Sequence, residues 1–561
     1  MGPGECLVWE QFTMQRRWRL FALLLPYLAW VSRYHFVCDD AFISFRYGRN
    51  LARGYGLTYN VSDGPVEGYS NFLWVLLSAV AESQLWDVVW LAPLVSTLCG
   101  VVLVIAFERF CRERLGFDPA TAFVATAWFA WSPTTAVWST SGLATMPFAL
   151  VFFLTAESLL FRRANVRSVV LCALLMLLRS EGLLWVGCLL ALSVLSRLLD
   201  RERHVLKGLG RVALGVCALA IVYTSFRGAH FGTLVPNTAL VKVGWSLERL
   251  LRGLQYMGLY ALTFASFGLC LLGAPRMVAW RRGAGSVMVL LALAFPAYAV
   301  LVGGDFFPMG RLLLPGLLFS AALFGAWVQR LSESAEPRWR RASLWVAGVG
   351  LALQVAPGLD VHVVPDGIRS ALHFRHSDKE FLSEHARWAN MKDNVEGFER
   401  RGHALATLAG PRSRLVSQAI GAVGYYSNLY VYDQYGLVSR EVASRTVAAD
   451  EARQSPGHDK FVPASFFADE EPEILHSRLV QGLLATRLMK DSMDKWDVPE
   501  ALRERYVPDF VEVELPGAHK RSFLLWVREA TPEEHAPSLW QGFSDRRKDL
   551  LAELKEQEAS S

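Results

Sequence analysis

The sequence carries little charge. Only 19% of its 561 residues are Asp, Glu, Lys or Arg, whereas soluble domains have about 25%. Instead, 53% of the residues are hydrophobic, and they gather in runs of about 20, the length that spans a membrane. These runs fill residues 18–357 and then thin sharply. The scarcity of charge excludes an ordinary soluble enzyme and predicts a polytopic α-helical membrane domain, residues 1–358, followed by a soluble domain, residues 359–561.

Cysteine is also sparse, and none occurs after Cys270. The spacing of the eight cysteines fits neither a zinc site nor a disulfide framework. We interpret them as small apolar fillers of membrane helices. They are Cys6, Cys38, Cys99, Cys111, Cys172, Cys188, Cys217 and Cys270.

The first apolar stretch, residues 18–36, lacks a signal-peptide cleavage site. Three arginines precede it, but the residues after it, 37–40, are not the small residues that a signal peptidase requires. We therefore expect an uncleaved membrane anchor.

Basic clusters between the apolar runs predict the topology. They occur at residues 16–19, 109–114, 162–167, 197–211, 276–282 and 330–341. If all of these clusters are cytoplasmic, the chain spans a bacterial plasma membrane with its N-terminus on the cytoplasmic side and its C-terminal domain on the extracytoplasmic side. The expected spans, about eleven, are 18–36, 88–108, 119–137, 143–161, 167–179, 182–199, 211–227, 254–274, 286–303, 311–330 and 342–358.

The first outer loop, residues 38–87, contains an apolar stretch that we do not count as a span. This stretch, residues 70–86, includes Glu82 and is short. Counting it would place the arginines of residues 109–114 outside. We expect a helix that lies at the outer membrane surface.

The C-terminal domain has the pattern of a mixed α/β fold. A long helical pattern comes first, and short apolar runs separated by turn residues follow it. We expect a helix at 378–408, strands at 414–420 and 429–433 around a turn at 424–428, a strand pair at 510–515 and 522–528, and a charged tail at 545–561.

Two adjacent carboxylates, Asp39 and Asp40, follow the first span and are the predicted catalytic residues. One would take a proton from an acceptor hydroxyl, while the other orients it or binds a divalent cation, which we assign to Asp40. A carboxylate beside an apolar wall has a raised pKa, which suits a base. The alternative is helix capping, which accounts for one of the two acids.

Basic residues in the outer loops run against the usual preference of Lys and Arg for the cytoplasmic side, and they indicate an anionic ligand. The predicted phosphate ligands are Arg46, Arg179, Lys242 and Arg311. The alternatives are a solvated basic face at Arg46 and simple ion pairs of the other two arginines with Glu181 and Asp305.

Polar and aromatic side chains of the same loops are the predicted sugar or acceptor contacts. The aromatic ones are equally typical of membrane-interface anchors, and residues 236–238 are also typical of a capped turn. Gly303 and Gly304 allow a ligand to approach the backbone before Asp305 closely. The predicted contacts are Glu67, Tyr69, Asn71, Trp74, Glu181, Asn237, Thr238 and Asp305.

Together, these motifs resemble the GT-C superfamily of polytopic glycosyltransferases. The resemblance is carried by residues 39–47 (DDAFISFRY), 66–74 (VEGYSNFLW), 234–238 (LVPNT) and 303–311 (GGDFFPMGR), and it extends to 421–427 (GAVGYYS) and 456–460 (PGHDK). The most similar branch contains the terminal β-(1→2) arabinofuranosyltransferases of mycobacterial cell-wall biogenesis. The resemblance implies a polyprenyl-phosphate sugar donor, an acidic pair at the catalytic centre and an extracytoplasmic domain that helps to hold the acceptor.

Two positions depart from the pattern of that superfamily. Relatives usually have Ser-Gly-Leu-Glu-Thr where this chain has Ala144 in place of the glutamate, and they favour Arg-Pro-Glu-Gly where it has Ser180 in place of the proline. The first departure removes one acidic group from the region of the expected site.

The sequence thus predicts an integral-membrane glycosyltransferase. It would move a sugar, arabinofuranose or another pentose, from polyprenyl phosphate to an extracytoplasmic glycan or protein, with no nucleic-acid partner. The alternatives are a lipid-linked sugar transporter and a non-catalytic scaffold. A transporter would have ionisable groups near mid-membrane and two related halves, whereas here the acids lie at span ends and no internal repeat is visible.

Overall fold

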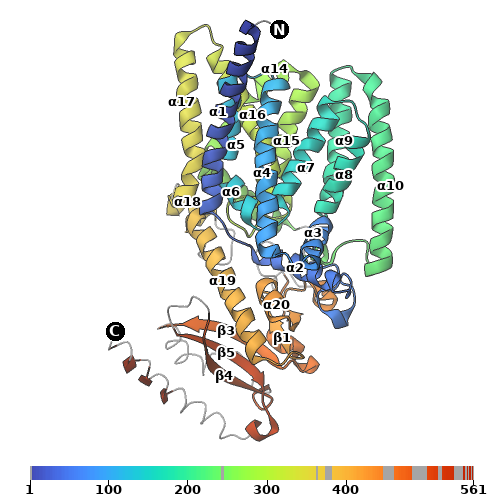
Figure 1. The fold of residues 1–561 in the computed structure, drawn as a ribbon, viewed down its shortest axis with the longest axis vertical. Coiled ribbons are helices and arrows are strands. Elements are labelled where there is room, and N and C mark those ends of the chain that lie inside the picture. Colours follow the sequence, from blue (N-terminus) through green and yellow to red (C-terminus); the bar gives the residue numbers. More distant parts are fainter. Residues whose placement is uncertain are drawn as a thin grey trace.

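The computed structural model describes residues 3–241, 246–361, 364–372, 382–445, 460–482, 502–515 and 521–535, with a few residues of the tail at 548–549, 552–553, 555–556 and 559. Figure 1 shows a bundle of long, roughly parallel helices with a smaller domain, built on a sheet, attached at one end. The N-terminus lies at the opposite end of the bundle. This is a polytopic helical architecture with a C-terminal α/β domain, as the sequence predicts.

The bundle is built from helices that follow the apolar runs. They are α1 (Pro3–Arg33), α4 (Val88–Glu113), α5 (Pro119–Ala130), α6 (Pro133–Thr140), α7 (Thr145–Phe161), α8 (Val166–Leu178), α9 (Gly182–Leu199), α10 (Leu206–Phe231), α12 (Leu247–Thr263), α13 (Ser266–Leu269), α14 (Ala274–Trp280), α15 (Arg282–Leu301), α16 (Leu314–Ser332) and α17 (Pro337–Val355). Short 3-10 turns, η2 (Arg203–Val205), η3 (Cys270–Gly273), η4 (Arg311–Leu313) and η5 (Ala356–Leu359), join some of them.

Fewer helices reach spanning length than the eleven expected spans. Within the described residues, six helices are long and apolar enough to cross a membrane, or up to eight if each of two bent pairs counts as one span. The expected span 119–137 is divided before Pro133, and α6 then meets α7 at 115°. The expected span 254–274 bends by 90° after α12. The hydropathy of an apolar run predicts that the run lies in the membrane, but it does not predict where the helix breaks or bends within the run.

Helix α16 forms the centre of the bundle. Of its most apolar window, 89% is buried, against 17% for α10 at the periphery. An all-round apolar helix is stable only where neighbours cover every face. Glycine permits one of these contacts, because a Cβ at Gly273 would lie 1.8 Å from the carbonyl oxygen of Leu323 in α16.

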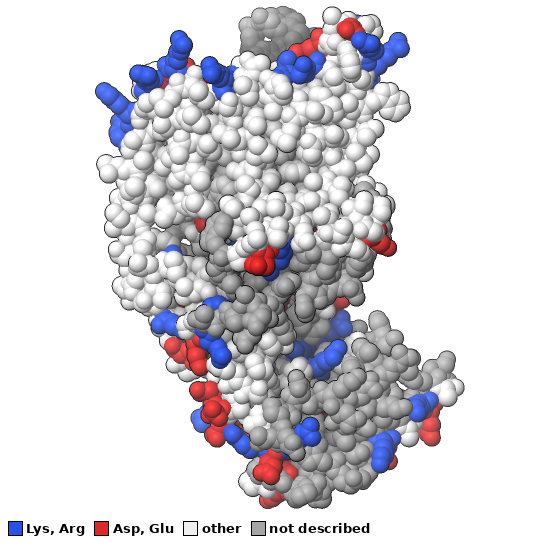
Figure 2. Space-filling model, turned by 180° about the vertical axis from the view of Figure 1, so that it is seen from behind, with Lys and Arg blue, Asp and Glu red and all other residues white. Residues whose placement is uncertain are grey.

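Charge is distributed unevenly along the bundle. Figure 2 shows Lys and Arg side chains gathered at the end far from the C-terminal domain, next to a broad band that lacks charge. Such a band matches the hydrocarbon layer of a bilayer. The molecule is therefore a multi-pass membrane protein.

Short elements lie where the bundle meets the C-terminal domain: α2 (Asp39–Ala52), η1 (Val61–Asp63), α3 (Phe72–Ser83) and α11 (Asn237–Leu240). The twelve residues of α3 are about 18 Å long, shorter than the roughly 30 Å hydrocarbon layer. Helix α3 alone is thus shorter than that layer, and the expectation that residues 70–86 lie at the outer membrane surface stays a prediction.

The C-terminal domain packs helices against one mixed sheet. Its strands run in the order β2-β1-β3-β5-β4, with β1 parallel to β2 and β3, and the other neighbours antiparallel. Its elements are α18 (Asp366–Ala371), α19 (Glu384–Leu408), β1 (Arg414–Ser417), α20 (Gly421–Ser427), β2 (Tyr430–Asp433), α21 (Arg440–Ser444), η7 (Ala464–Glu470), β3 (Ile474–Gln481), β4 (Tyr506–Val513), β5 (Ser522–Glu529) and η9 (Pro532–His535).

Two expectations for this domain were wrong. Residues 424–428 are not a turn between strands, because helix α20 covers residues 421–427. Strand β3, which pairs with β1 and β5, was not expected at all. The motif at residues 456–460 lies outside the described residues except for Lys460, whose ammonium donates a hydrogen bond to the carbonyl of Ala443, 2.5 Å away.

Candidate active site

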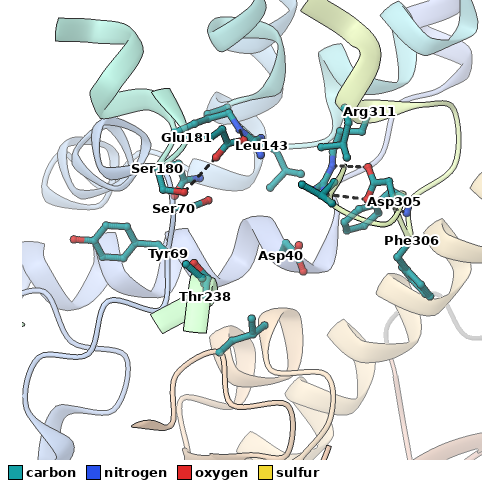
Figure 3. A pocket seen from close by; sticks show the side chains of 18 of the residues that line it. Asp40, Tyr69, Ser70, Leu143, Ser180, Glu181, Thr238, Asp305, Phe306 and Arg311 are labelled. Atoms are coloured by element: carbon teal, nitrogen blue, oxygen red, sulfur yellow. Dashed lines mark hydrogen bonds and ion pairs between the residues drawn. The ribbon is translucent and has the colours of Figure 1, made fainter. Parts of the chain in front are cut away.

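A cavity of about 210 Å³ lies at the end of the bundle that faces the C-terminal domain. Its walls come from α2, from residues 68–71, from residues 143–144 just before α7, from residues 179–181, from α11 and from residues 304–312. Segments that are far apart in the sequence therefore share one pocket (Figure 3). We call it the first cavity.

Asp40 reaches the first cavity from the first turn of α2. Figure 3 shows its carboxylate in the centre of the view, with Glu181 on one side and the pair of Asp305 and Arg311 on the other. The backbone begins helix α2 at Asp39, so Cys38, and neither aspartate, occupies the N-cap position. Helix capping, the alternative role considered for these acids, therefore does not account for Asp40.

Two ion pairs border the first cavity. The guanidinium of Arg311 donates two hydrogen bonds to Asp305, each 3.1 Å long. Arg179 donates to Glu181 over 2.5 Å. Such paired guanidiniums are held in one orientation, and each retains N–H groups for an anion.

A third arginine of this cavity, Arg249, was not expected. It lines the first cavity from α12 and lies against Gly303. Its place in the outer loop that ends near residue 252 was the signal that could have found it. Lys242, the expected cation of that loop, lies outside the described residues.

Asp39 points away from the first cavity, toward the C-terminal domain. Its carboxylate accepts hydrogen bonds from the backbone N–H groups of Gly421, 3.2 Å away, and Ala422, 2.8 Å away. Burial raises the pKa of Asp39 to about 6, although the hydrogen bond from Ala422 opposes this rise. Asp39 therefore attaches α2 to α20.

Arg46 belongs to the same attachment and does not line either cavity. Its guanidinium donates to the carbonyls of Tyr59 (3.0 Å), Gly424 (2.7 Å) and Leu429 (2.7 Å). Arg49 donates to the carbonyl of Tyr425 over 2.8 Å. The motif at residues 39–47 thus holds the two domains together as well as presenting Asp40.

The expected sugar contacts divide into two groups. Tyr69, Asn71 and Thr238 line the first cavity with Glu181 and Asp305. The remaining three do not, and their polar groups are engaged in structural contacts. Glu67 pairs with Arg227 over 2.8 Å, the indole of Trp74 donates to the carbonyl of Gly142 over 2.7 Å, and the amide of Asn237 donates to the carbonyl of Gly436 over 2.7 Å.

The described residues do not form a metal site of their own. No three His, Cys, Asp or Glu side chains in that part of the chain come close enough together to hold an ion. Asp40, the expected ligand of a divalent cation, lines the first cavity, and its role in metal binding stays a prediction.

A second cavity, of about 280 Å³, adjoins the first. The two cavities share Asp40, Ile43, Phe306, Phe307 and Leu437 as wall residues. The other walls of the second cavity come mainly from α19 and from residues 418–420 of the C-terminal domain. Asp40 thus lies where the first cavity meets a cavity that is walled by both domains.

Comparison with solved structures identifies the architecture. ArnT from Cupriavidus metallidurans, in its crystal structure bound to undecaprenyl phosphate, aligns with a TM-score of 0.50 at 14% identity, covering 94% of this chain and 99% of that chain. This protein has the GT-C fold. The fold expected from the sequence motifs is thereby confirmed. The arabinofuranosyltransferase AftD from Mycobacteria aligns with a TM-score of 0.46 at 16% identity, covering 92% of this chain and 40% of AftD.

Sequence similarity connects this GT-C protein to an arabinofuranosyltransferase. The terminal beta-(1->2)-arabinofuranosyltransferase of Corynebacterium glutamicum is 26% identical over 330 residues, which cover 50% of this chain and 46% of the relative. The match thus spans about half the length of that relative. A family model described as "Domain of unknown function (DUF8728)" matches residues 386–520, within the C-terminal domain.

Proposed function

We propose that this GT-C protein is a membrane glycosyltransferase that moves a sugar from a polyprenyl-phosphate donor to an acceptor outside the cytoplasm. The observation that carries the proposal is the position of Asp40, between an arginine-bordered cavity and a second cavity whose walls come from both the membrane domain and the C-terminal domain. A pentofuranose such as arabinofuranose is the proposed sugar, supported by the similarity to the arabinofuranosyltransferase of C. glutamicum.

The first cavity suits the donor. Leu143, Ala144 and Leu312 give it an apolar side next to the ends of membrane helices, where a polyprenyl chain can lie. Arg179, Arg249 and Arg311 line the same cavity and provide guanidiniums for a phosphate. Neutralising the phosphate makes it a better leaving group, so positioned charge supplies much of the rate. The undecaprenyl phosphate bound by ArnT supports this class of ligand.

Asp40 is the proposed base. In the transfer, the oxygen of an acceptor hydroxyl bonds to the anomeric carbon, and the bond between that carbon and the phosphate oxygen breaks with its electron pair remaining on the phosphate. The hydroxyl proton passes to Asp40. Holding donor and acceptor on either side of one carboxylate lowers the barrier further, because the reacting groups are already positioned.

The orientation follows from the charge distribution. The end rich in Lys and Arg in Figure 2 would face the cytoplasm of a bacterium, by the positive-inside rule. Both cavities then lie on the extracytoplasmic side of the plasma membrane, together with the C-terminal domain.

A transfer assay with two matched variants tests the proposal. Purified protein would receive a radiolabelled polyprenyl-phosphate arabinofuranose and a cell-wall glycan acceptor. We expect Asp40→Asn to reduce kcat by at least about 100-fold, since a base typically contributes that much. Asp393→Asn, which removes an exposed carboxylate of α19 that lines neither cavity, is the control for the loss of one charge and should retain wild-type activity. Equal rates for wild type and Asp40→Asn would refute the assignment.

A non-catalytic scaffold is the second candidate function. It is favoured by Ala144, which lines the first cavity where relatives usually present a carboxylate. Wild-type protein that transfers no sugar from any polyprenyl-phosphate pentose in this assay would establish the scaffold over the enzyme.

A further inference from the structure

The second cavity contains polar side chains that the reaction at Asp40 does not use. Asn390 and Asn394 lie one turn apart on α19, and Gln418 follows strand β1. All three side chains are exposed, and none forms a hydrogen bond within the described residues. Each amide offers two N–H donors and one carbonyl acceptor. Amides four residues apart on a helix face the same way and can contact neighbouring hydroxyls of one ligand.

The charge of this cavity opposes an anionic ligand. Arg387 is its single cationic wall residue among those described. The guanidinium of Arg387 is bonded to Glu384 and to the carbonyl of Phe306. Two acidic residues, Asp39 and Asp40, also line this cavity. A phosphate or carboxylate in this cavity would therefore meet two acids and one neutralised base.

The apolar walls suit the carbon faces of a sugar. Phe306 and Phe307 separate the two cavities, and Met391, Val395 and Phe398 continue the surface along α19. Burying C–H surface against such side chains is favourable, while hydroxyls at the ring edge require hydrogen-bond partners. The amides of Asn390, Asn394 and Gln418 provide those partners.

We propose that the second cavity binds the acceptor, and that this acceptor is the uncharged, hydroxyl-rich end of a glycan recognised by Asn390, Asn394 and Gln418. The inference rests on the proposed function and deepens it, because it assigns acceptor recognition to the domain of unknown function at residues 386–520. A hydroxyl bound there faces Asp40 across the shared wall. Its oxygen takes the sugar and its proton goes to Asp40, while the polyprenyl phosphate leaves through the first cavity.

Steady-state kinetics with defined acceptors test this inference. The probes are octyl glycosides of neutral arabinofuranosyl and mannosyl disaccharides, compared with the same glycosides carrying one phosphate. We expect wild type to prefer the neutral probes. The double variant Asn390→Ala with Asn394→Ala should raise the acceptor KM about tenfold, as expected for two lost hydrogen bonds, without raising the donor KM. Gln418→Ala should raise the acceptor KM by about threefold.

Asp393→Ala is the matched control. It lies between the two asparagines on α19, it is exposed, and it does not line the cavity, so transfer should be unchanged. As a second variant, Asn394→Lys should shift preference toward the phosphorylated probes. Neutral-acceptor KM values that equal wild type in the Asn variants, or a wild-type preference for phosphorylated probes, would overturn the inference and leave the proposed function intact. Absence of transfer by wild type to every probe would instead refute the proposed function, and the inference with it.

Discussion

The carboxylate of Asp39 and the backbone N–H of Ala422 are 2.8 Å apart although 383 positions separate them in the chain. This hydrogen bond joins the first helix after the first span to helix α20 of the C-terminal domain. It also separates the roles of two adjacent acids, since Asp39 faces α20 while Asp40 faces the first cavity. Asp39, the residue next to the proposed base Asp40, thus helps to position the C-terminal domain, which contributes walls to the second cavity.

Removing the Asp39 carboxylate should loosen the C-terminal domain. Asp39→Ala leaves the N–H groups of Gly421 and Ala422 without their acceptor, and each such loss costs about 1–3 kcal/mol. We expect a lower Tm and faster proteolysis near residues 409–413. Asp39→Asn retains one acceptor oxygen and should lose less. An unchanged Tm in Asp39→Ala would show that this attachment contributes nothing to stability.

The contribution that the buried carboxyls of Asp39 and Asp433 make to stability should fall as the pH rises from about 4 to about 7. Burial raises the pKa of both Asp39 and Asp433 to about 6, from an ordinary value of 3.8. A raised pKa means that the folded protein binds the proton more tightly than the unfolded chain, so this stability is present at low pH and is lost through pH 6. Each carboxyl contributes at most about 3 kcal/mol.

This dependence can be measured as Tm against pH in detergent. Asp39→Asn should make the decrease smaller than in wild type and leave the part that Asp433 contributes. The exposed Asp393→Asn should leave the profile unchanged. A wild-type profile in Asp39→Asn would contradict the assignment.

Arg46 should matter for stability and not for donor binding. Its guanidinium holds three carbonyls at the joint between the domains. Arg46→Lys cannot reach all three, and we expect a loss of about 3 kcal/mol with a wild-type donor KM for the folded fraction. Arg53→Lys, exposed at the end of the same helix, is the control. A donor KM that rises in Arg46→Lys, with no change in Tm, would instead support the phosphate-binding role predicted from the sequence.

A methyl group at Gly421 should separate the two domains. A Cβ there would lie 1.9 Å from the carbonyl oxygen of Asp39. Such overpacking typically costs 1–3 kcal/mol or more, so Gly421→Ala should lower Tm and expose α20 to protease. At Gly410 the nearest atom would lie 3.7 Å from the added Cβ, which makes Gly410→Ala a fair comparison. Identical behaviour of the two variants would refute close docking of α20 on α2.

Much of the first cavity could be predicted from the sequence. Hydropathy and the position of arginines determine which loops share one side, and Asp40, Arg179, Arg311, Asp305 and Glu181 do line one pocket. The prediction needed no contact information, because membrane topology already brings these loops together.

The remaining features depended on contacts that no local pattern reports. The carbonyls that engage Arg46 come from Gly424 and Leu429, more than 370 positions away. Residues of α20 were expected to form a turn. The carboxylate that accepts a hydrogen bond from the first turn of α20 belongs to Asp39 in α2, so no local pattern indicates where this helix begins. The second cavity could not be predicted from the sequence either. Its walls belong to two domains, and the sequence does not indicate how these domains pack against each other.

A structure of the protein in complex with undecaprenyl phosphate would test the central claim most directly. We predict that the phosphate lies in the first cavity, in contact with the guanidiniums of Arg179, Arg249 and Arg311, with the side chain of Asp40 between it and the second cavity. Phosphate density beside Arg46, or in the second cavity between Asp39 and Asn390, would contradict the account.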